Sequence, residues 1–142
     1  MNIRIILFLF LIFFACVPNG ERTSVVNETD KVASLRYDAV GCLSEGLAYV
    51  ELNGKYGYID TTGKEVIPLK YDDAWFFEEG LAPVKLNGKW GFVDKTNKVV
   101  IPFKYDYADH FRDGLAFVKL NDKWGHIDKT DKVVFPFKYY DE

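Results

Sequence analysis

Residues 87–94 read NGKWGFVD, and two other stretches repeat this pattern almost letter for letter. NGKYGYID stands at 53–60 and NDKWGHID at 121–128, so both steps are 34 residues. Self-similarity at a fixed period of this length indicates a tandem-repeat architecture. Other short motifs keep the same step, namely Gly-Leu-Ala at 46–48, 80–82 and 114–116, and the proline at 68, 102 and 136. The units of the repeat are 37–70, 71–104 and 105–138.

Each unit carries a two-residue turn between short alternating runs, which is the strongest local signal for a β-hairpin. With Asn87-Gly88 as the turn, Val84 lies opposite Gly91. One face of every hairpin then carries small or β-branched residues, and the other carries the aromatic residues. We expect the small-residue face to be the core face, where a glycine lets a neighbouring element approach closely. The glycines at this register are Gly57, Gly91 and Gly125.

A second tight turn and a third strand follow each hairpin. In the second unit the strand is predicted over 98–101, ending at Pro102, because proline gives up a ladder hydrogen bond. The sequence therefore predicts an all-β fold of about three antiparallel strands per unit, stacked as an array of hairpins. A closed three-fold barrel or trefoil-like arrangement is the alternative, because closure removes exposed sheet edges. The turn residues tolerate a left-handed backbone and are Gly63, Asn97 and Asp131.

The composition excludes several classes of protein. The chain has 142 residues, a formal net charge of -3 and 49% hydrophobic residues, which argues against a disordered tail and against a nucleic-acid binder. The two cysteines, Cys16 and Cys42, match no zinc-binding spacing. His110 and His126 stand where other units have other residues, so we expect packed rings rather than catalytic bases. We predict no enzyme activity, no cofactor and no bound metal.

Recurring aspartates are the remaining polar motif. Each is followed two residues later by a threonine, which predicts hydrogen bonds that start a turn rather than a metal site. These residues are Asp60, Asp94 and Asp128.

The N-terminus has the character of a targeting segment. Arg4 precedes an apolar run over 5–15, which as a helix spans roughly 16 Å, about half of a bilayer core. The run ends at Cys16 and a polar segment follows. This arrangement resembles a bacterial lipoprotein signal peptide, in which a small residue precedes the cysteine that becomes lipidated. The resemblance implies a signal peptide at 1–15, lipid attachment at Cys16, a polar tether over 16–34 and a repeat domain at 35–142.

The repeat itself resembles a known family. Residues 78–106, EEGLAPVKLNGKWGFVDKTNKVVIPFKYD, are similar to the WG repeat, a short β-rich bacterial repeat, and the resemblance covers about residues 35–138. The signature pair is present at 90–91 and 124–125, whereas the first unit has Tyr56 in place of tryptophan. The resemblance implies tandem β-hairpins, often in secreted or envelope proteins, that act as binding or scaffolding modules.

Five aromatic residues form the candidate binding site. An exposed row of rings could stack on a sugar or grip an aromatic-rich peptide, since large apolar patches mark interaction sites. The alternative is that these rings pack against the link between units and form a second core. The five residues are Tyr56, Tyr58, Trp90, Phe92 and Trp124.

These expectations together predict a non-catalytic lipoprotein, anchored by lipid in the bacterial cell envelope on its periplasmic or surface face. Its repeat array would present a binding surface for protein or glycan. The partners would be the membrane, through Cys16, and an envelope protein or glycan, with no nucleic acid. An inert structural spacer is the alternative, and a cell-wall hydrolase accessory is a more distant one.

Overall fold

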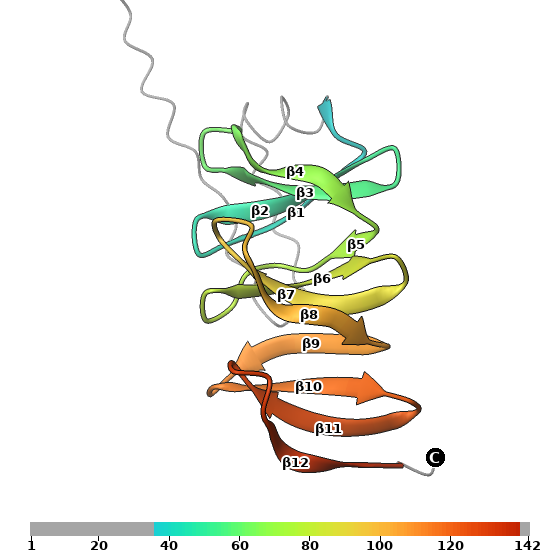
Figure 1. Ribbon diagram of the computed structural model, residues 1–142. Coiled ribbons are helices and arrows are strands. Elements are labelled where there is room, and N and C mark those ends of the chain that lie inside the picture. The colour runs from blue at the N-terminus through green and yellow to red at the C-terminus, as the bar shows by residue number, and fades with distance from the viewer. Residues whose placement is uncertain (1–35, 140–142) are drawn as a thin grey trace, which may run out of the picture.

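The computed structural model describes residues 36–139, and these residues form three four-stranded antiparallel sheets (Figure 1). Each sheet is a simple meander in which the strands pair in chain order. The first sheet comprises β1 (Ala39–Ser44), β2 (Leu47–Leu52), β3 (Lys55–Asp60) and β4 (Glu65–Tyr71). The second comprises β5 (Asp73–Ala74), β6 (Leu81–Leu86), β7 (Lys89–Asp94) and β8 (Val99–Tyr105). The third comprises β9 (Tyr107–Arg112), β10 (Leu115–Leu120), β11 (Lys123–Asp128) and β12 (Val133–Lys138).

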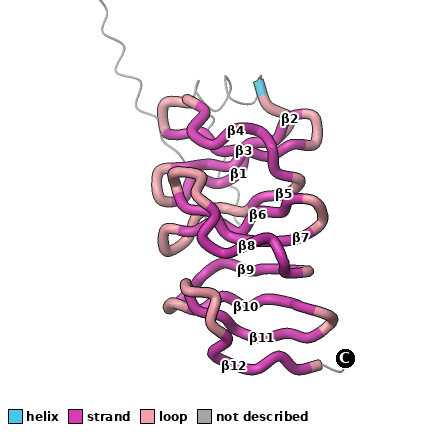
Figure 2. Tube along the Cα trace, viewed as in Figure 1, coloured by secondary structure: helices cyan, strands magenta, loops and turns pink. Residues whose placement is uncertain are grey.

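The sheets are stacked one after another in an open column, with short loops at both ends of the strands (Figure 2). The prediction of an all-β array of stacked hairpins is therefore confirmed, and the closed barrel or trefoil is wrong. The central hairpin of each sheet has the predicted register, with Val84 opposite Gly91 in the second unit. Asn87 and Gly88 have φ values of 51° and 81°, as a two-residue hairpin turn requires.

The predicted count of about three strands per unit is one too low. The strand predicted over 98–101 runs through Pro102 to Tyr105, and the link after it forms β9. Proline is accepted here because β8 is an edge strand and bulges where it passes Gly91. A single residue then connects one sheet to the next, Asp72 after β4 and Asp106 after β8.

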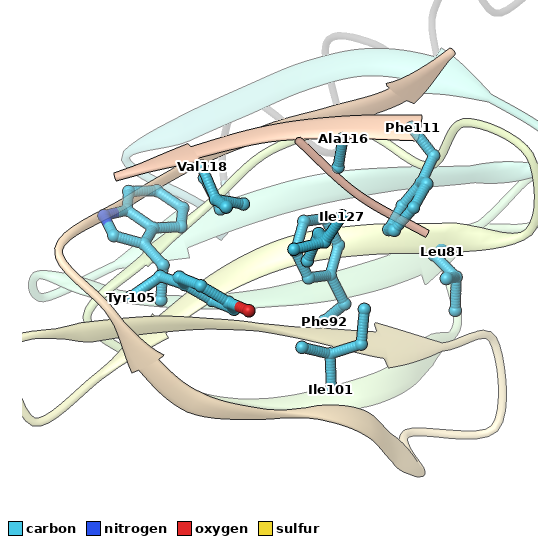
Figure 3. Packing of buried hydrophobic residues seen from close by; sticks show 10 residues of the cluster. Leu81, Phe92, Ile101, Tyr105, Phe111, Ala116, Val118 and Ile127 are labelled. Atoms are coloured by element: carbon cyan, nitrogen blue, oxygen red, sulfur yellow. The ribbon is translucent and has the colours of Figure 1, made fainter. Parts of the chain in front are cut away.

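The core lies between the sheets rather than on one face of each. The aromatic face of one sheet meets the small-residue face of the next, so the interior sheet is buried on both sides. Figure 3 shows this junction, where Phe92 and Ile101 of the second sheet meet Ala116 and Val118 of the third. The small-residue face is therefore a core face as predicted, and stacking buries the aromatic face as well.

Candidate functional site

The predicted row of exposed aromatic residues does not exist on the first two sheets. Tyr58 and Phe92 have no exposed surface and Trp90 is 4% exposed, so their proposed ligand-stacking role is wrong. The next sheet in the column covers them, which is the second core given as the alternative. Trp90 lies 6.1 Å from the Tyr107 ring on β9, within the link segment as that alternative requires. Tyr56 is partly buried against the second sheet.

The signature glycines are needed for a close approach, and the element that approaches is a strand of the same sheet. A β-carbon added at Gly91 would lie 2.6 Å from the Ile101 carbonyl oxygen, and one at Gly57 would lie 2.5 Å from that of Ile67. Both carbonyls belong to the bulged last strand of the same sheet. The glycine therefore admits this strand across the hairpin, and the neighbouring sheet is not what approaches it.

Trp124 differs from Trp90 because no further sheet follows it in the described part of the chain. The third sheet leaves its aromatic face open there, and we call this surface the terminal aromatic face. Phe135 is 54% exposed, whereas the equivalent Ile67 and Ile101 have no exposed surface. The terminal aromatic face comprises Phe117, Trp124, His126, Phe135 and Tyr139.

Four of these rings contact one another, and Lys123 Nζ lies 4.8 Å from the ring centroid of the fifth, Tyr139. Phe117 and Trp124 are stacked, with centroids 4.7 Å apart and an interplanar angle of 13°. His126 lies 4.9 Å from the Phe117 ring and 5.4 Å from the Phe135 ring. Lys119 Nζ lies 5.7 Å from the Trp124 ring centroid, a cation–π distance. A hollow of about 260 Å³ opens between β11 and β12, lined by Trp124, Gly125, His126, Phe135, Pro136 and Lys138.

Sequence reasoning found Trp124 and missed most of its neighbours. The signal was present as departures of the last unit from the other two. Phe135 replaces isoleucine, and His126 replaces the tyrosine or phenylalanine of the earlier units. Substitutions confined to the third unit indicate the surface that no other sheet of the described residues covers.

The recurring aspartates start turns, as predicted. Asp94 Oδ1 accepts hydrogen bonds from the Thr96 amide at 2.9 Å, the Thr96 hydroxyl at 2.7 Å and the Lys98 amide at 3.0 Å. The hydroxyl bond, ahead of the others, lowers the pKa of the Asp94 carboxyl. Asp60 and Asp128 repeat this arrangement with the same direction of pKa shift.

Other carboxylates form polar contacts that hold neighbouring sheets together, and we call each such set of contacts a clasp. Glu79, in the turn before β6, accepts a hydrogen bond of 3.1 Å from the Gly114 amide on the third sheet. Its carboxylate lies 3.2 Å from Lys129 Nζ, which also donates to the Glu79 carbonyl at 2.9 Å. Burial acts to raise the pKa of Glu79, but the Lys129 bond and the Gly114 amide outweigh it and lower the pKa. Glu45, Gly80 and Lys95 form the same clasp between the first two sheets.

His110 is a packed ring, as predicted. It is 7% exposed and stacks on Phe76 with centroids 3.9 Å apart. Burial, only partly opposed by the Asp109 carboxylate, lowers the pKa of this histidine. Within residues 36–139 no three His, Cys, Asp or Glu side chains converge to hold a metal ion.

The predicted lipid attachment site, signal peptide and tether lie outside the described residues. Cys16 therefore stays a prediction. Across residues 36–139, no helix is long and apolar enough to cross a membrane.

The described geometry agrees with what comparison with protein families finds. The model of the WG containing repeat matches residues 30–56, 56–90 and 90–124, and the chain therefore belongs to the WG-repeat family. Each full match runs from one signature aromatic position to the next, so the 34-residue period of the family and of the sheets is the same. The search of curated proteins finds no match.

Solved structures similar to the chain include one titled "Crystal structure of HIRA(644-1017)". The TM-score is 0.47 and the sequence identity is 10%. The match covers 70% of this chain and 38% of that one, so the chain spans well under half the length of that structure.

Proposed function

We propose that the protein is a non-catalytic lipoprotein of the bacterial cell envelope whose WG-repeat array is an interaction module for protein or glycan. A lipid on Cys16 holds it at the membrane. The terminal aromatic face is its binding surface.

The exposure of Phe135 is the observation that carries this proposal. The equivalent positions of the other two sheets, Ile67 and Ile101, are fully covered. The last unit instead presents a larger aromatic side chain with about half of its surface in water. Large apolar groups gathered on a surface usually mark an interaction site.

The placement of the ionisable groups supports a non-catalytic role. His110 is enclosed by aromatic rings, and His126 lies between Phe117 and Phe135. Hydrogen bonds in turns engage Asp94 and its repeats, and clasps between sheets engage Glu45 and Glu79. These groups therefore already have structural roles.

The test is capture by the full chain in its membrane. Envelope extract and an array of cell-wall glycans are each presented to the wild type and to Phe135→Asp. We expect the wild type to retain a ligand that Phe135→Asp loses. Val66→Asp is the matched control, because Val66 is 42% exposed on the first sheet, and it should retain the ligand. Equal capture by all three proteins would refute the terminal aromatic face as the binding surface, and capture by none would favour the inert spacer.

A further inference from the structure

The two junctions inside the column show what normally covers an aromatic face of this type. In the first junction, Tyr58 and Ile67 are covered by Ala82, Val84 and Val93 of the second sheet. In the second junction the covering residues are again small or β-branched, namely Ala116, Val118 and Ile127. Every junction therefore joins an aromatic face to the small-residue face of the sheet that follows.

Polar clasps flank both junctions at matching positions. Lys55 Nζ lies 2.6 Å from Asp72 at the first junction, and Lys89 pairs with Asp106 at the second. The preceding sheet supplies the lysine and the following sheet supplies the aspartate. In the second type of clasp, the preceding sheet supplies Glu45 or Glu79, and the following sheet supplies a glycine amide and a lysine.

The third sheet has the residues that the preceding sheet of a junction contributes to each type of clasp. Lys123 occupies the position of Lys55 and Lys89, and Asp113 occupies the position of Glu45 and Glu79. Within the described residues neither Lys123 nor Asp113 forms an ion pair. The terminal aromatic face is therefore bordered by a cation and an anion at the positions where the interior junctions are locked.

We infer that the terminal aromatic face docks the small-residue face of a four-stranded WG sheet carried by another protein chain. This inference rests on the proposed function and names its partner. The partner sheet presents alanine, valine and glycine to Trp124 and Phe135. Its link aspartate pairs with Lys123, and its turn amide and lysine meet Asp113.

A second copy of this chain is a less suitable partner. On the first sheet Ala48 and Val50 are fully buried, and Leu43, Leu52 and Leu69 of the same sheet pack against them. That sheet also lacks the clasp lysine, because Thr61 stands where the later units have Lys95 and Lys129. The missing lysine therefore favours a different WG chain over head-to-tail self-assembly.

A sugar is the less suitable occupant. Phe117 lies parallel to Trp124 at 4.7 Å, so one face of the indole is already occupied by the chain itself. Stacking on a sugar requires a free ring face. The flanking charges at Lys123 and Asp113 match the pattern of the interior junctions, which join sheet to sheet.

The first test uses the full chain with a second copy of residues 105–138 placed after Lys138 as a supplied WG sheet. The tryptophans carry a fluorine label, and the solvent isotope shift of each fluorine resonance reports its exposure to water. We expect the shift of Trp124 to fall to that of Trp90, while that of Trp75, which is 38% exposed, stays unchanged. An unchanged Trp124 shift would overturn the fit of a WG sheet to this surface.

Lys123→Ala tests the clasp when it is made both in this extended chain and in the natural chain. It should lower the Tm of the extended chain by more than that of the natural chain, because both chains lose the contact of Lys123 with the tyrosine ring after Lys138 and only the extended chain also loses the clasp. Equal shifts in both chains would contradict the clasp.

The second test identifies the natural occupant by placing the photo-crosslinking residue p-benzoylphenylalanine at Phe135 in source cells. We expect crosslinks to a WG strand of another chain, and none from the same probe at Val66. Crosslinks to another copy of this chain, to a glycan or to an unrelated protein would overturn the inference and leave the proposed function standing. Absence of any crosslink at Phe135 would overturn both.

Discussion

Lys55 on the first sheet and Asp72, the one-residue link to the second sheet, are joined through Nζ and Oδ1 atoms 2.6 Å apart. The other carboxylate oxygen of Asp72 accepts a 2.7 Å hydrogen bond from the Asn87 amide. One side chain therefore ties the single-residue link to the hairpin before it and to the hairpin after it. Asp106 repeats this arrangement with Lys89 and Asn121.

The Asp72 bridge should make stability depend on pH. Its hydrogen bond to Lys55, more than any other cause, lowers the pKa of the Asp72 carboxyl below its ordinary value. Such a group adds stability above its unfolded pKa and loses it as the pH falls through the lower folded pKa. We expect Asp72→Asn to lower the Tm at pH 7 and to have little effect near pH 2, in melts across that range. Glu65→Gln, at an exposed carboxyl, is the control, and its Tm should equal that of the wild type both at pH 7 and near pH 2.

Gly63→Asn should stabilise the protein. Tyr71 donates to Asn97 at 2.5 Å, but among the described residues the buried Tyr37 hydroxyl has no partner because Gly63 occupies the equivalent position. Asparagine tolerates the left-handed backbone there, since Asn97 has a φ of 66°. Supplying the missing acceptor should raise the free energy of unfolding by about 1 kcal/mol, measured by urea denaturation.

Tyr37→Phe provides the control for that gain. In the Tyr37→Phe background the Gly63→Asn substitution should add nothing, because no hydroxyl remains to be paired. A gain of equal size in both backgrounds would show that the hydrogen bond is not its source.

Gly91→Ala should cost more stability than Gly125→Ala. The added β-carbon at Gly91 would lie 2.6 Å from a backbone oxygen, whereas at Gly125 its nearest neighbour is a Phe137 ring atom at 3.0 Å. A ring can shift more easily than a strand, so we expect about 1–3 kcal/mol at Gly91 and less at Gly125. Thermal melts of the two variants decide this, and the reverse order would refute the bulged-strand explanation.

Trp90→Ala should destabilise the fold by about 3–5 kcal/mol, the range for a large buried aromatic residue. Trp124→Ala should cost less, because the terminal aromatic face leaves its ring partly in water. Denaturant titration of both variants tests the difference. A Trp90→Ala protein as stable as the wild type would contradict a packing role for the signature tryptophan.

Cys16→Ala should release the protein from the membrane fraction. Lipidation uses the Cys16 thiol, so the competing outcome is a disulfide with Cys42, the other cysteine of the chain. Fractionation of source cells, with intact-mass measurement of the mature wild type, separates the two. Equal membrane association of both proteins, or a mature mass without lipid, would refute the anchor.

The motifs that recur every 34 residues made much of the fold predictable. The Asn-Gly turn at 87–88 fixed the hairpin register, because its backbone requirement admits few alternatives. The part of the strand beyond Pro102 was missed, because a proline usually indicates the end of a strand unless the bulge and the edge position are known. The exposure of Trp90 could not be judged from its own hairpin, since the sheet that buries it lies 34 residues further along the chain.

The candidate site was predictable only in part for the same reason. Trp124 and Trp90 share one register in the sequence, and what separates them is the presence of a covering sheet. Phe135 was the local indication, because it replaces a residue that is isoleucine in both earlier units. Position within the array decides whether a repeated side chain holds the fold together or remains free to meet a partner.

The one-residue link at Asp106 limits how such a protein can change its length in evolution. Ala108 lies two residues beyond it and is fully buried. Because side chains alternate along a strand, an extra residue in the link would turn Ala108 toward solvent. We therefore expect small insertions at this point to be destabilising, whereas a duplication of one whole 34-residue unit preserves the alternation. Families built this way are expected to differ in whole numbers of repeats.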